Sequence, residues 1–468
     1  MFLGIENINP SKVAAIDENG LQLTYGELCD AAREISAAAK ERTLVFALCE
    51  NTIGSLVGYV SFISSGVVPL LLDSNMPEEH IDCLVNTYNP SYIWTHESRD
   101  FSKFRKVFSG WGHNLYATDL KPFSLHDELA LLVTTSGSTG SPKLVRQSFK
   151  NIESNTKSIC EYLEIDSTER PVTTLPMQYV YGTSIINSHL KKGATILLTT
   201  KGIMQKEFWE FFKEQKATSI AGVPYTYEIL KKLRFTNMKL PSLKTMTQAG
   251  GKLLPELHKE FAQYASENDV NFVIMYGAAE ATARMGYLPP KMSLEKYGSM
   301  GIAIPGGRFE LIDESGDVIR EYGMRGELVY YGENVTLGYA ENGEDLKKGD
   351  ERSGRLETGD MATLDSDGYY TIVGRKKRFL KIFGNRVGLD ETERLIKSRF
   401  SGIECACCGV DDKMYIFITD ASLKSDILGH ISDATSLNVQ AFCIKVIDEI
   451  PKNDSGKTQY SKLEEYYD

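Results

Sequence analysis

The sequence predicts an α/β protein with a large N-terminal part and a small C-terminal part. Three observations lead to this prediction. Segments with helical periodicity alternate with short apolar runs between residues 24 and 275. Gly- and Pro-rich segments then dominate, and the composition changes again after Gly374-Arg375. The length of 468 residues also exceeds one ordinary domain.

Local signals define the expected elements of the N-terminal part. Thr24 and Glu27 have the spacing of a capping box, which predicts a helix that continues to Ala39. The apolar stretch 56–72 predicts a buried helix followed by a buried strand, because glycines, serines and a proline interrupt it too often for a membrane span. Pro224 is expected to break the chain after a strand. Apolar runs predict strands at 43–48, 67–72, 129–133, 194–199, 219–223 and 270–275, and a helix is expected at 206–215.

The remaining segments predict two smaller assemblies. YGSMGIAIPGGRFELID, RGELVYYGENVTLGYA and GYYTIVGR are typical of short antiparallel strands in a barrel-like subdomain. Beyond Arg375 we expect helices at 390–397 and 425–434 and strands at 405–410, 414–419 and 441–446. The predicted division is therefore an N-terminal domain at 1–376 and a small, mobile α+β domain at 377–468.

Composition and charge exclude several classes of protein. Hydrophobic residues make up 42% and charged residues 25%, as in ordinary globular proteins. The net charge of −11 argues against nucleic acid or an anionic membrane as the main partner. The first residues, MFLGIENINP, have neither the basic start nor the apolar core of a signal peptide, and the cysteines are mostly scattered. Both observations favour a reduced, cytoplasmic location.

Two local clusters allow more than one interpretation. Cys405, Cys407 and Cys408 lack the paired spacing of a zinc site, so buried strand residues are favoured over metal ligands. Between Arg375 and Arg399 nine Lys and Arg residues stand against three Asp and Glu residues. This excess fits a solvated helix face and a surface for an anion or an acidic protein equally well.

The segment TTSGSTGSPK at 134–143 carries the strongest functional signal, directly after a predicted buried strand. It offers uncovered backbone N–H groups, hydroxyls and a cation from Gly137, Gly140, Ser136, Ser138, Thr139 and Lys143. Convergent donors of this kind suit a polyphosphate. The segment is not a Walker A loop, because no glycine directly precedes the lysine. A flexible Ser/Gly turn is the alternative.

Three later segments add groups that nucleotide chemistry needs. Tyr276-Gly277-Ala278-Ala279-Glu280 follows a predicted strand and offers an aromatic ring to cover a base and a carboxylate for Mg²⁺. Thr358-Gly359-Asp360 presents a carboxylate suited to ribose hydroxyls. PKNDSGK places Lys457 on a turn near the C-terminus, where a mobile element can bring positive charge to a phosphoryl group. Each segment alone is also a common turn.

In this order the motifs resemble those of the adenylate-forming superfamily, which includes acyl- and aryl-CoA ligases, the adenylation domains of peptide synthetases and firefly luciferase. The resemblance extends from LTYGEL at Leu23 to SGKTQY at Ser455, and it is strongest to acyl-CoA and acyl-carrier-protein ligases. It implies an N-terminal domain of two stacked α/β subdomains plus a β-barrel, and a C-terminal lid.

The resemblance also implies how ATP and Mg²⁺ are bound. The loop at 134–143 would grip the β- and γ-phosphates, while Ser138 and Glu280 would bind the magnesium ion. Lys457 would meet the substrate carboxylate and the α-phosphate. The residues implied to border the adenine and the ribose are Gly250, Gly251, Lys252, Tyr276, Gly277, Ala278, Ala279, Asp360 and Arg375.

Two reaction steps are implied. The acid attacks the α-phosphorus of ATP and releases pyrophosphate, which leaves an acyl-adenylate. The lid then rotates about Lys377, removes Lys457 and presents Lys381, Gly384 and Arg386. A thiol finally attacks the adenylate and releases AMP. This thiol belongs to coenzyme A or to the phosphopantetheine of an acyl carrier protein.

Several positions depart from the pattern of the superfamily. Ala279 replaces a usual threonine, Arg378 a common aspartate, and Tyr460 a usual arginine. Loss of one hydrogen bond to a charged group costs about 1.5–3 kcal/mol, so Ala279 would slow the enzyme without inactivating it. A nucleotide-binding pseudoenzyme is the alternative, although Glu280 and Lys457 argue against it.

The substrate class follows from a few positions. Amino-acid-activating relatives carry an aspartate where this chain has Gly182, and a buried ammonium without a countercharge is costly. An α-amino acid is therefore disfavoured. The tyrosines and the glutamine among the pocket candidates favour a small or hydroxylated acyl acid, or an aryl acid, over a long fatty chain. The candidate pocket residues are Tyr179, Tyr181, Gly182, Tyr225, Gln248 and Ala249, each of which fits core packing equally well.

Overall fold

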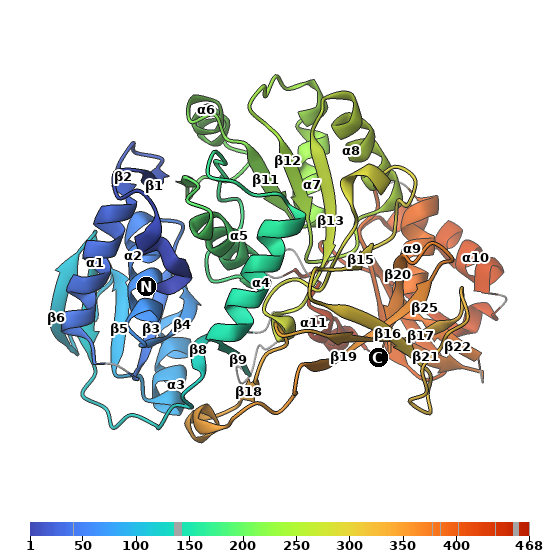
Figure 1. Cartoon of the computed structure of the whole chain (residues 1–468). Coiled ribbons are helices and arrows are strands. Elements are labelled where there is room, and N and C mark those ends of the chain that lie inside the picture. Colours follow the sequence, from blue (N-terminus) through green and yellow to red (C-terminus); the bar gives the residue numbers. More distant parts are fainter. Residues whose placement is uncertain are drawn as a thin grey trace. The chain divides into compact units, whose positions relative to one another are not determined.

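The chain divides into two compact units (Figure 1). A computed structural model describes residues 1–40, 42–134, 143–376, 378–383, 385–400, 402–435, 437–452 and 458–467, with the backbone alone at Asn385 and Arg386. The first unit contains Met1–Arg308 and Tyr331–Leu356, and the second contains Phe309–Tyr330 and Glu357–Asp468. The second unit thus combines strands predicted for the barrel-like subdomain with the C-terminal part.

The largest sheet of the first unit lies between helices. Its strands in spatial order are β18 (Gly338–Ala340), β9 (Leu144–Ser148), β8 (Leu129–Thr134), β4 (Val68–Asp73), β3 (Leu44–Cys49), β5 (Tyr92–His96), β7 (His113–Ala117) and β6 (Arg105–Gly110). Successive side chains of a strand face opposite sides. Val45 and Ala47 of β3 therefore pack in one core cluster with residues of α1 (Tyr25–Ala38) and α2 (Ile53–Ser64), and Phe46 packs in another with α3 (Glu78–Tyr88).

A second sheet of the first unit brings predicted site segments to one edge. Its order is β11 (Ser219–Gly222), β12 (Thr245–Gln248), β13 (Asn271–Tyr276), β14 (Gly286–Tyr287) and β15 (Ile302–Ala303). The first three strands are parallel, with Gly222 opposite Gln248 and Gln248 opposite Ile274. Ligands bind at the carboxyl ends of such strands. The turns at 249–252 and 277–280 both begin at this edge.

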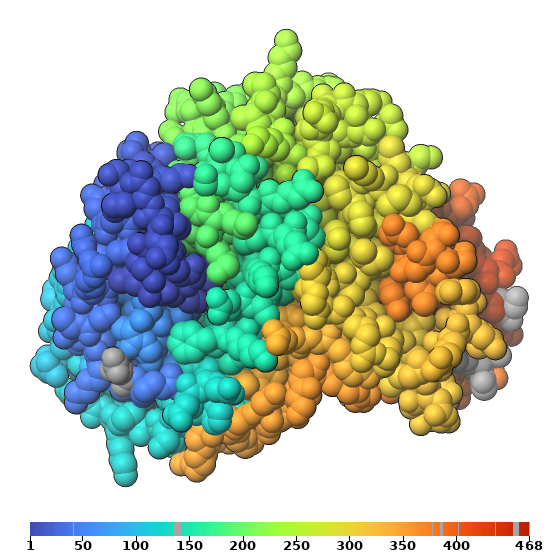
Figure 2. All heavy atoms as spheres, in the orientation of Figure 1, coloured from blue at the N-terminus to red at the C-terminus, as the bar shows by residue number. Residues whose placement is uncertain are grey.

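The other elements of the first unit cover these sheets. A small sheet has the order β10 (Ile196–Leu198), β1 (Val13–Asp17) and β2 (Gln22–Thr24), and the remaining helices are α4 (Phe149–Tyr162), α5 (Val180–Lys191), α6 (Lys206–Glu214), α7 (Pro224–Lys232) and α8 (Pro255–Glu267). In Figure 2 the dark blue N-terminal segment lies against the green part of this unit, and its short helix η1 (Phe2–Asn7) contacts α5.

The second unit is built around three sheets in its described part. The first has the order β16 (Arg308–Ile312), β17 (Arg325–Tyr331), β19 (Arg355–Leu364) and β20 (Tyr370–Arg375), the second pairs β21 (Phe379–Ile382) with β22 (Asn385–Gly388), and the third has the order β23 (Cys405–Val410), β24 (Lys413–Ile418) and β25 (Phe442–Val446). Its helices are α9 (Leu389–Arg399), α10 (Lys424–Thr435) and α11 (Tyr460–Leu463). Two buried apolar clusters consist of residues between Leu380 and Tyr467, so this part of the chain has a core of its own.

Most of the predicted elements are confirmed. The Thr24–Glu27 capping box opens α1, and the predicted strands correspond to β3, β4, β8, β10, β11 and β13 within one or two residues at most ends. Strand β11 ends at Gly222, before Pro224, as expected. Pro224 begins α7, because the first position of a helix needs no N–H donor.

Two findings concern metals and membranes. Cys405, Cys407 and Cys408 are buried in β23, and burial raises the pKa of the Cys405 thiol to about 12. The described part of the chain contains no cluster of three or more His, Cys, Asp or Glu residues arranged for a metal ion. None of its described helices has the length and apolar character that crossing a membrane requires.

Candidate active site

Part of the predicted site lies outside the described residues. These residues are Ser136, Gly137, Ser138, Thr139, Gly140, Lys377, Gly384 and Lys457, together with the side chain of Arg386. Their roles stay predictions. Of the others, Asp360, Arg375 and Lys381 belong to the second unit, and the rest belong to the first.

The turn after β13 positions Glu280. A Cβ atom at Gly277 would lie 1.7 Å from the carbonyl oxygen of Ala283, so this turn requires glycine. Glu280 is in the short helix η3 (Ala279–Ala281), and its carbonyl oxygen accepts three hydrogen bonds of 3.0 Å. The donors are the backbone N–H and hydroxyl of Thr336 and the guanidinium of Arg352. The backbone of Glu280 is therefore firmly held.

Tyr339 connects the charged groups around Glu280. Its hydroxyl donates to Glu280 Oε1 at 2.7 Å. Two cations lie over the Tyr339 ring. Lys143 Nζ is 3.8 Å from the ring centroid, and the guanidinium carbon of Arg352 is 4.6 Å from it. Burial and the neighbouring Glu280 raise the pKa of Tyr339 to about 12, so the phenol stays protonated at neutral pH. Lys143 and Glu280, which were predicted from distant segments, thus contact the same tyrosine.

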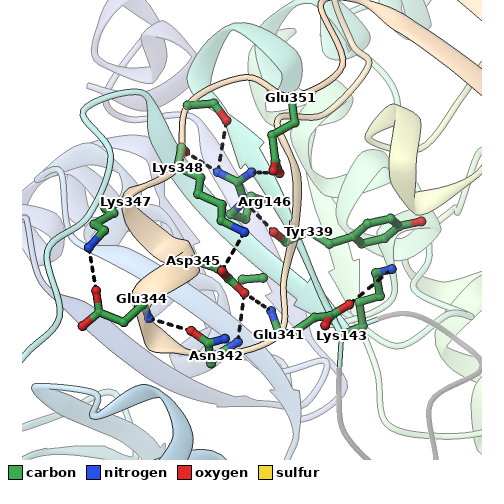
Figure 3. Close-up of polar contacts among 12 residues, drawn as sticks. Lys143, Arg146, Tyr339, Glu341, Asn342, Glu344, Asp345, Lys347, Lys348 and Glu351 are labelled. Carbon is green, nitrogen blue, oxygen red and sulfur yellow. Dashed lines mark hydrogen bonds and ion pairs between the residues drawn. The ribbon is translucent and has the colours of Figure 1, made fainter.

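Arg146 holds the strand that carries Tyr339 (Figure 3). Strands β9 and β18 are antiparallel neighbours, with Val145 opposite Tyr339. Arg146 Nε donates to the Tyr339 carbonyl oxygen at 2.9 Å, and Nη2 donates to the Leu337 carbonyl oxygen at 3.2 Å. Nη2 also contacts Glu351 Oε2 at 2.5 Å. The sequence interpretation did not single out Arg146, because its complete burial follows from the pairing of β9 with β18 and not from a local pattern.

The segment after β12 is shaped by its own hydrogen bonds. The buried Gln248 side chain donates from Nε2 to the carbonyl oxygens of Ala249 and Gly251, at 3.0 and 2.9 Å. Gly250 has a φ of +81°, and a Cβ atom there would lie 2.7 Å from the Tyr179 hydroxyl. Glycine therefore permits both the backbone conformation and the approach of Tyr179.

Three further predicted residues occupy more open positions. Tyr276 is half-buried at the end of β13, and Lys252 is exposed. Tyr225 is on α7 with 42% of its surface exposed. These positions leave the three side chains accessible to a ligand.

A pocket lies between α4, α5 and the parallel strands β11 to β13. Its wall includes Ser184, Ile185, Ser188, Thr247, Met275 and Arg284. This surface combines apolar groups with a few polar ones, as in pockets for small organic molecules.

The predicted pocket residues lie around this wall without forming it. Tyr179, Tyr181 and Ala249 belong to an apolar cluster that also contains the wall residue Met275. The Tyr181 hydroxyl is 2.8 Å from Thr247 Oγ1. A Cβ atom at Gly182 would lie 2.3 Å from the carbonyl oxygen of Pro176, so close packing explains this glycine.

In the second unit, Asp360 and Arg375 are brought together. They are opposite each other in the antiparallel pair β19 and β20, and Arg375 Nε is 2.8 Å from Asp360 Oδ1. Asp360 is buried, whereas Arg375 is exposed. Lys381 is also exposed, on β21, and its backbone N–H donates to Asp411 Oδ1 at 2.8 Å.

Part of the basic stretch between Arg375 and Arg399 is paired within the second unit. Arg378 contacts Asp390 at 2.5 Å and Glu393 at 2.7 Å. Its guanidinium carbon also lies 3.6 Å from the centroid of the Tyr460 ring. Arg378 and Tyr460, the two residues of this part that depart from the pattern of the superfamily, therefore contact each other.

Comparison with known proteins identifies the family. Residues 6–340 match the family described as AMP-binding enzyme, which covers more than half of the chain. The protein belongs to this family.

The relatives are CoA ligases by name. Oxalate–CoA ligase of Arabidopsis thaliana is 28% identical over 354 residues, which cover 71% of this chain and 66% of that protein. 2-Succinylbenzoate–CoA ligase of Bacillus licheniformis is 27% identical over 354 residues, which cover 73% and 71%. Among solved structures, o-succinylbenzoate coenzyme A synthetase (MenE) from Bacillus subtilis, in complex with ATP and a magnesium ion, superposes with a TM-score of 0.80 at 20% identity and covers 99% and 98% of the two chains.

These findings confirm the predicted superfamily, the α/β multidomain fold and the class of enzyme, an AMP-forming acid ligase. ATP and Mg²⁺, the predicted cofactors, are bound by the structural relative.

Proposed function

We propose that the protein joins a small acyl, hydroxyacyl or aryl acid to AMP and then transfers it to the thiol of coenzyme A. One observation carries this proposal. Tyr339 gathers Lys143, Arg352 and Glu280 at the edge where the motif turns begin. Lys143, which also lies 3.5 Å from Glu341 Oε1, and Arg352 supply cations for a polyphosphate, and Glu280 supplies a carboxylate for its metal ion.

The donor set fits Mg²⁺. Glu280 supplies one carboxylate in a part of the chain that has no cage of three acidic or histidine ligands among its described residues. Mg²⁺ favours this arrangement, because it takes most of its ligands from phosphates and water. When bound, the ion would offset phosphate charge. Glu280, with the predicted Ser138, would hold it.

The protein side chains orient and neutralise the reactants. Lys143 and Arg352 would attract the phosphates, and Lys457 would offset charge on the α-phosphate. The Asp360 carboxylate, paired with Arg375, would accept hydrogen bonds from the ribose hydroxyls. A carboxylate oxygen of the acid forms a bond to the α-phosphorus, and the bond to the β-phosphate breaks with its electrons leaving on pyrophosphate.

The second step belongs to the C-terminal part. A core of its own after residue 379 supports a separate lid at 377–468 with its hinge at Lys377. The thiol sulfur bonds to the acyl carbon, AMP leaves with the electrons of the broken C–O bond, and the thiol proton passes to water. Lys381, Gly384 and Arg386 would face the incoming thiol.

Coenzyme A is favoured over an acyl carrier protein. The names of the relatives specify CoA. In addition, three cations of the basic stretch already have partners, since Arg375 pairs with Asp360, Lys376 with Glu327 and Arg378 with Asp390. Paired cations offer less attraction to an acidic carrier protein.

The test is pyrophosphate release from ATP over a panel of short acyl, hydroxyacyl and aryl acids, with Glu280→Gln as the inactive control. We expect release with some of these acids, and thioester formation when CoA is added. Release from none of them would overturn the proposal and favour the pseudoenzyme. Faster acylation of a carrier protein than of CoA would refute the assigned acceptor.

A further inference from the structure

Arg284 is a buried cation in the pocket wall, and the proposed reaction gives it no role. It lines the pocket and is 3% exposed. Its Nε is buried and has no hydrogen-bond partner among the described residues. The guanidinium carbon lies 3.9 Å from the centroid of the Tyr181 ring, so an aromatic face covers one side of the group.

The carboxylates of the described residues do not neutralise this charge. Glu169, the acidic residue of the pocket wall, is 3.5 Å from Lys244 Nζ and accepts a hydrogen bond from the Thr218 hydroxyl. No ion pair joins Arg284 to any Asp or Glu in the part of the chain that the structure describes. The Tyr162 side chain forms a hydrogen bond with Arg284, but a protonated phenol carries no charge. A buried cation without an anionic partner is costly, and this cost indicates an anion supplied by a ligand.

The other polar side chains of the pocket wall are hydrogen-bonded within the protein or neutral, so Arg284 is the group that would bind an anionic ligand. The hydroxyls of Ser184 and Ser188 donate to the carbonyl oxygens of Tyr181 and Ile185. Burial lowers the pKa of His189, which therefore stays neutral at pH 7. Arg284 is thus the uncompensated charge of the described wall, and a guanidinium matches a carboxylate with two parallel N–H donors.

We propose that Arg284 binds a second carboxylate of the acid substrate, so that the enzyme prefers dicarboxylic acids. One carboxylate is joined to AMP, and the other pairs with Arg284 in the pocket. This inference rests on the proposed function and adds the substrate class. It also gives a second reason against α-amino acids, because their ammonium group would face a buried cation.

Matched substrate pairs test the inference. Each aliphatic or aryl dicarboxylic acid is compared with its own monoamide of equal length, and kcat/KM for pyrophosphate release is measured. We expect the unchanged protein to favour the diacid by about 10-fold or more, as one charged hydrogen bond requires. A monoamide used as well as its diacid would overturn the inference without any variant.

Variants then assign the preference to Arg284. In Arg284→Met, kcat/KM for pyrophosphate release should fall about 10-fold or more with diacids and change by less than about threefold with monoamides. Arg284→Lys should recover part of the preference for diacids. The control is Arg170→Met, which removes a half-buried arginine that donates to the Gln215 carbonyl oxygen and does not line the pocket. Equal losses on both substrates in Arg284→Met would overturn the assignment. If no acid releases pyrophosphate even with the unchanged protein, the proposed function itself fails.

Discussion

Tyr339 is the residue at which the charged groups of the first unit meet. Its hydroxyl donates to Glu280 Oε1 at 2.7 Å, and its ring faces Lys143. Tyr339→Phe keeps the ring and removes one hydrogen bond to a carboxylate, which is worth about 1.5–3 kcal/mol. We expect kcat/KM for ATP to fall about 10- to 100-fold at limiting Mg²⁺. Pyrophosphate release over a magnesium titration measures this effect.

The control for this variant is Tyr25→Phe. Tyr25 is a fully buried tyrosine, whereas Tyr339 is half-buried, and the Tyr25 hydroxyl donates to the carbonyl oxygen of Ala194 at 2.8 Å. It should lower thermal stability slightly and leave the magnesium dependence unchanged. A magnesium effect of the same size in both variants would show that Tyr339 acts only through the fold.

Ala279 offers a gain-of-function test. Ala279 is half-buried at the start of η3, next to Glu280, at the position for which the resemblance to the superfamily implies a threonine. Ala279→Thr restores a hydroxyl near the α-phosphate, so adenylation should become faster by up to about 10-fold. Ala279→Val has nearly the same shape without the hydroxyl and should not accelerate the reaction. Equal rates for the threonine and valine variants would rule out the hydrogen bond as the cause.

At the scale of an element, the turn after β13 depends on one close contact. A Cβ atom at Gly277 would lie 1.7 Å from the Ala283 carbonyl oxygen, which is backbone and cannot simply rotate away. Gly277→Ala should therefore cost about 1–3 kcal/mol of stability. It should also displace Glu280 and reduce activity further, as measured by chemical unfolding and pyrophosphate release.

Gly429 provides the matched control for the glycine variant. It lies in α10, and a Cβ atom there would have no other atom within 4 Å, so nothing opposes a methyl group at this position. Gly429→Ala should raise the stability of this helix by up to about 1 kcal/mol, because glycine is a poor helix former. If Gly429→Ala destabilised the protein, or if Gly277→Ala left its stability unchanged, the explanation from the space around these two glycines would be wrong.

Elements with strong local signals were predictable from the sequence. The buried runs of β3, β4 and β8 contain almost only apolar residues, and the capping box fixes the start of α1. Strand β12 reads Thr-Met-Thr-Gln and was missed, because its burial comes from its parallel neighbours and not from its own composition.

Residues of the candidate site were predictable from the sequence where they belong to a short motif. Glu280 and the Asp360–Arg375 pair follow from short segments. Tyr339 and Arg146 meet through the pairing of β9 with β18, which are far apart in the sequence, so no local pattern could reveal them. Arg284 required knowledge of burial, since only packing leaves its Nε without a partner among the described residues.

At the scale of the whole molecule, the C-terminal part is held together by contacts among its own residues. The contact of Arg378 with Tyr460 ties the start of this part to its last helix, and Glu393 accepts a hydrogen bond from the Tyr460 hydroxyl at 3.1 Å. Arg378 is held by Asp390 and Glu393 as well. Such internal ties suit a domain that moves as a single body about a hinge at Lys377.

A moving domain predicts that the two half-reactions respond to different lysines. Lys457→Ala should abolish pyrophosphate release while ATP still binds, because the charge at the α-phosphate is lost. Lys381→Ala should leave pyrophosphate release intact and slow thioester formation from pre-formed acyl-adenylate by about 10-fold or more. Lys424→Ala, another exposed position of this domain, serves as the control and should affect neither step. If Lys381→Ala slowed both steps equally, one arrangement of the domain would serve the whole reaction, and the proposed rotation about Lys377 would be unnecessary.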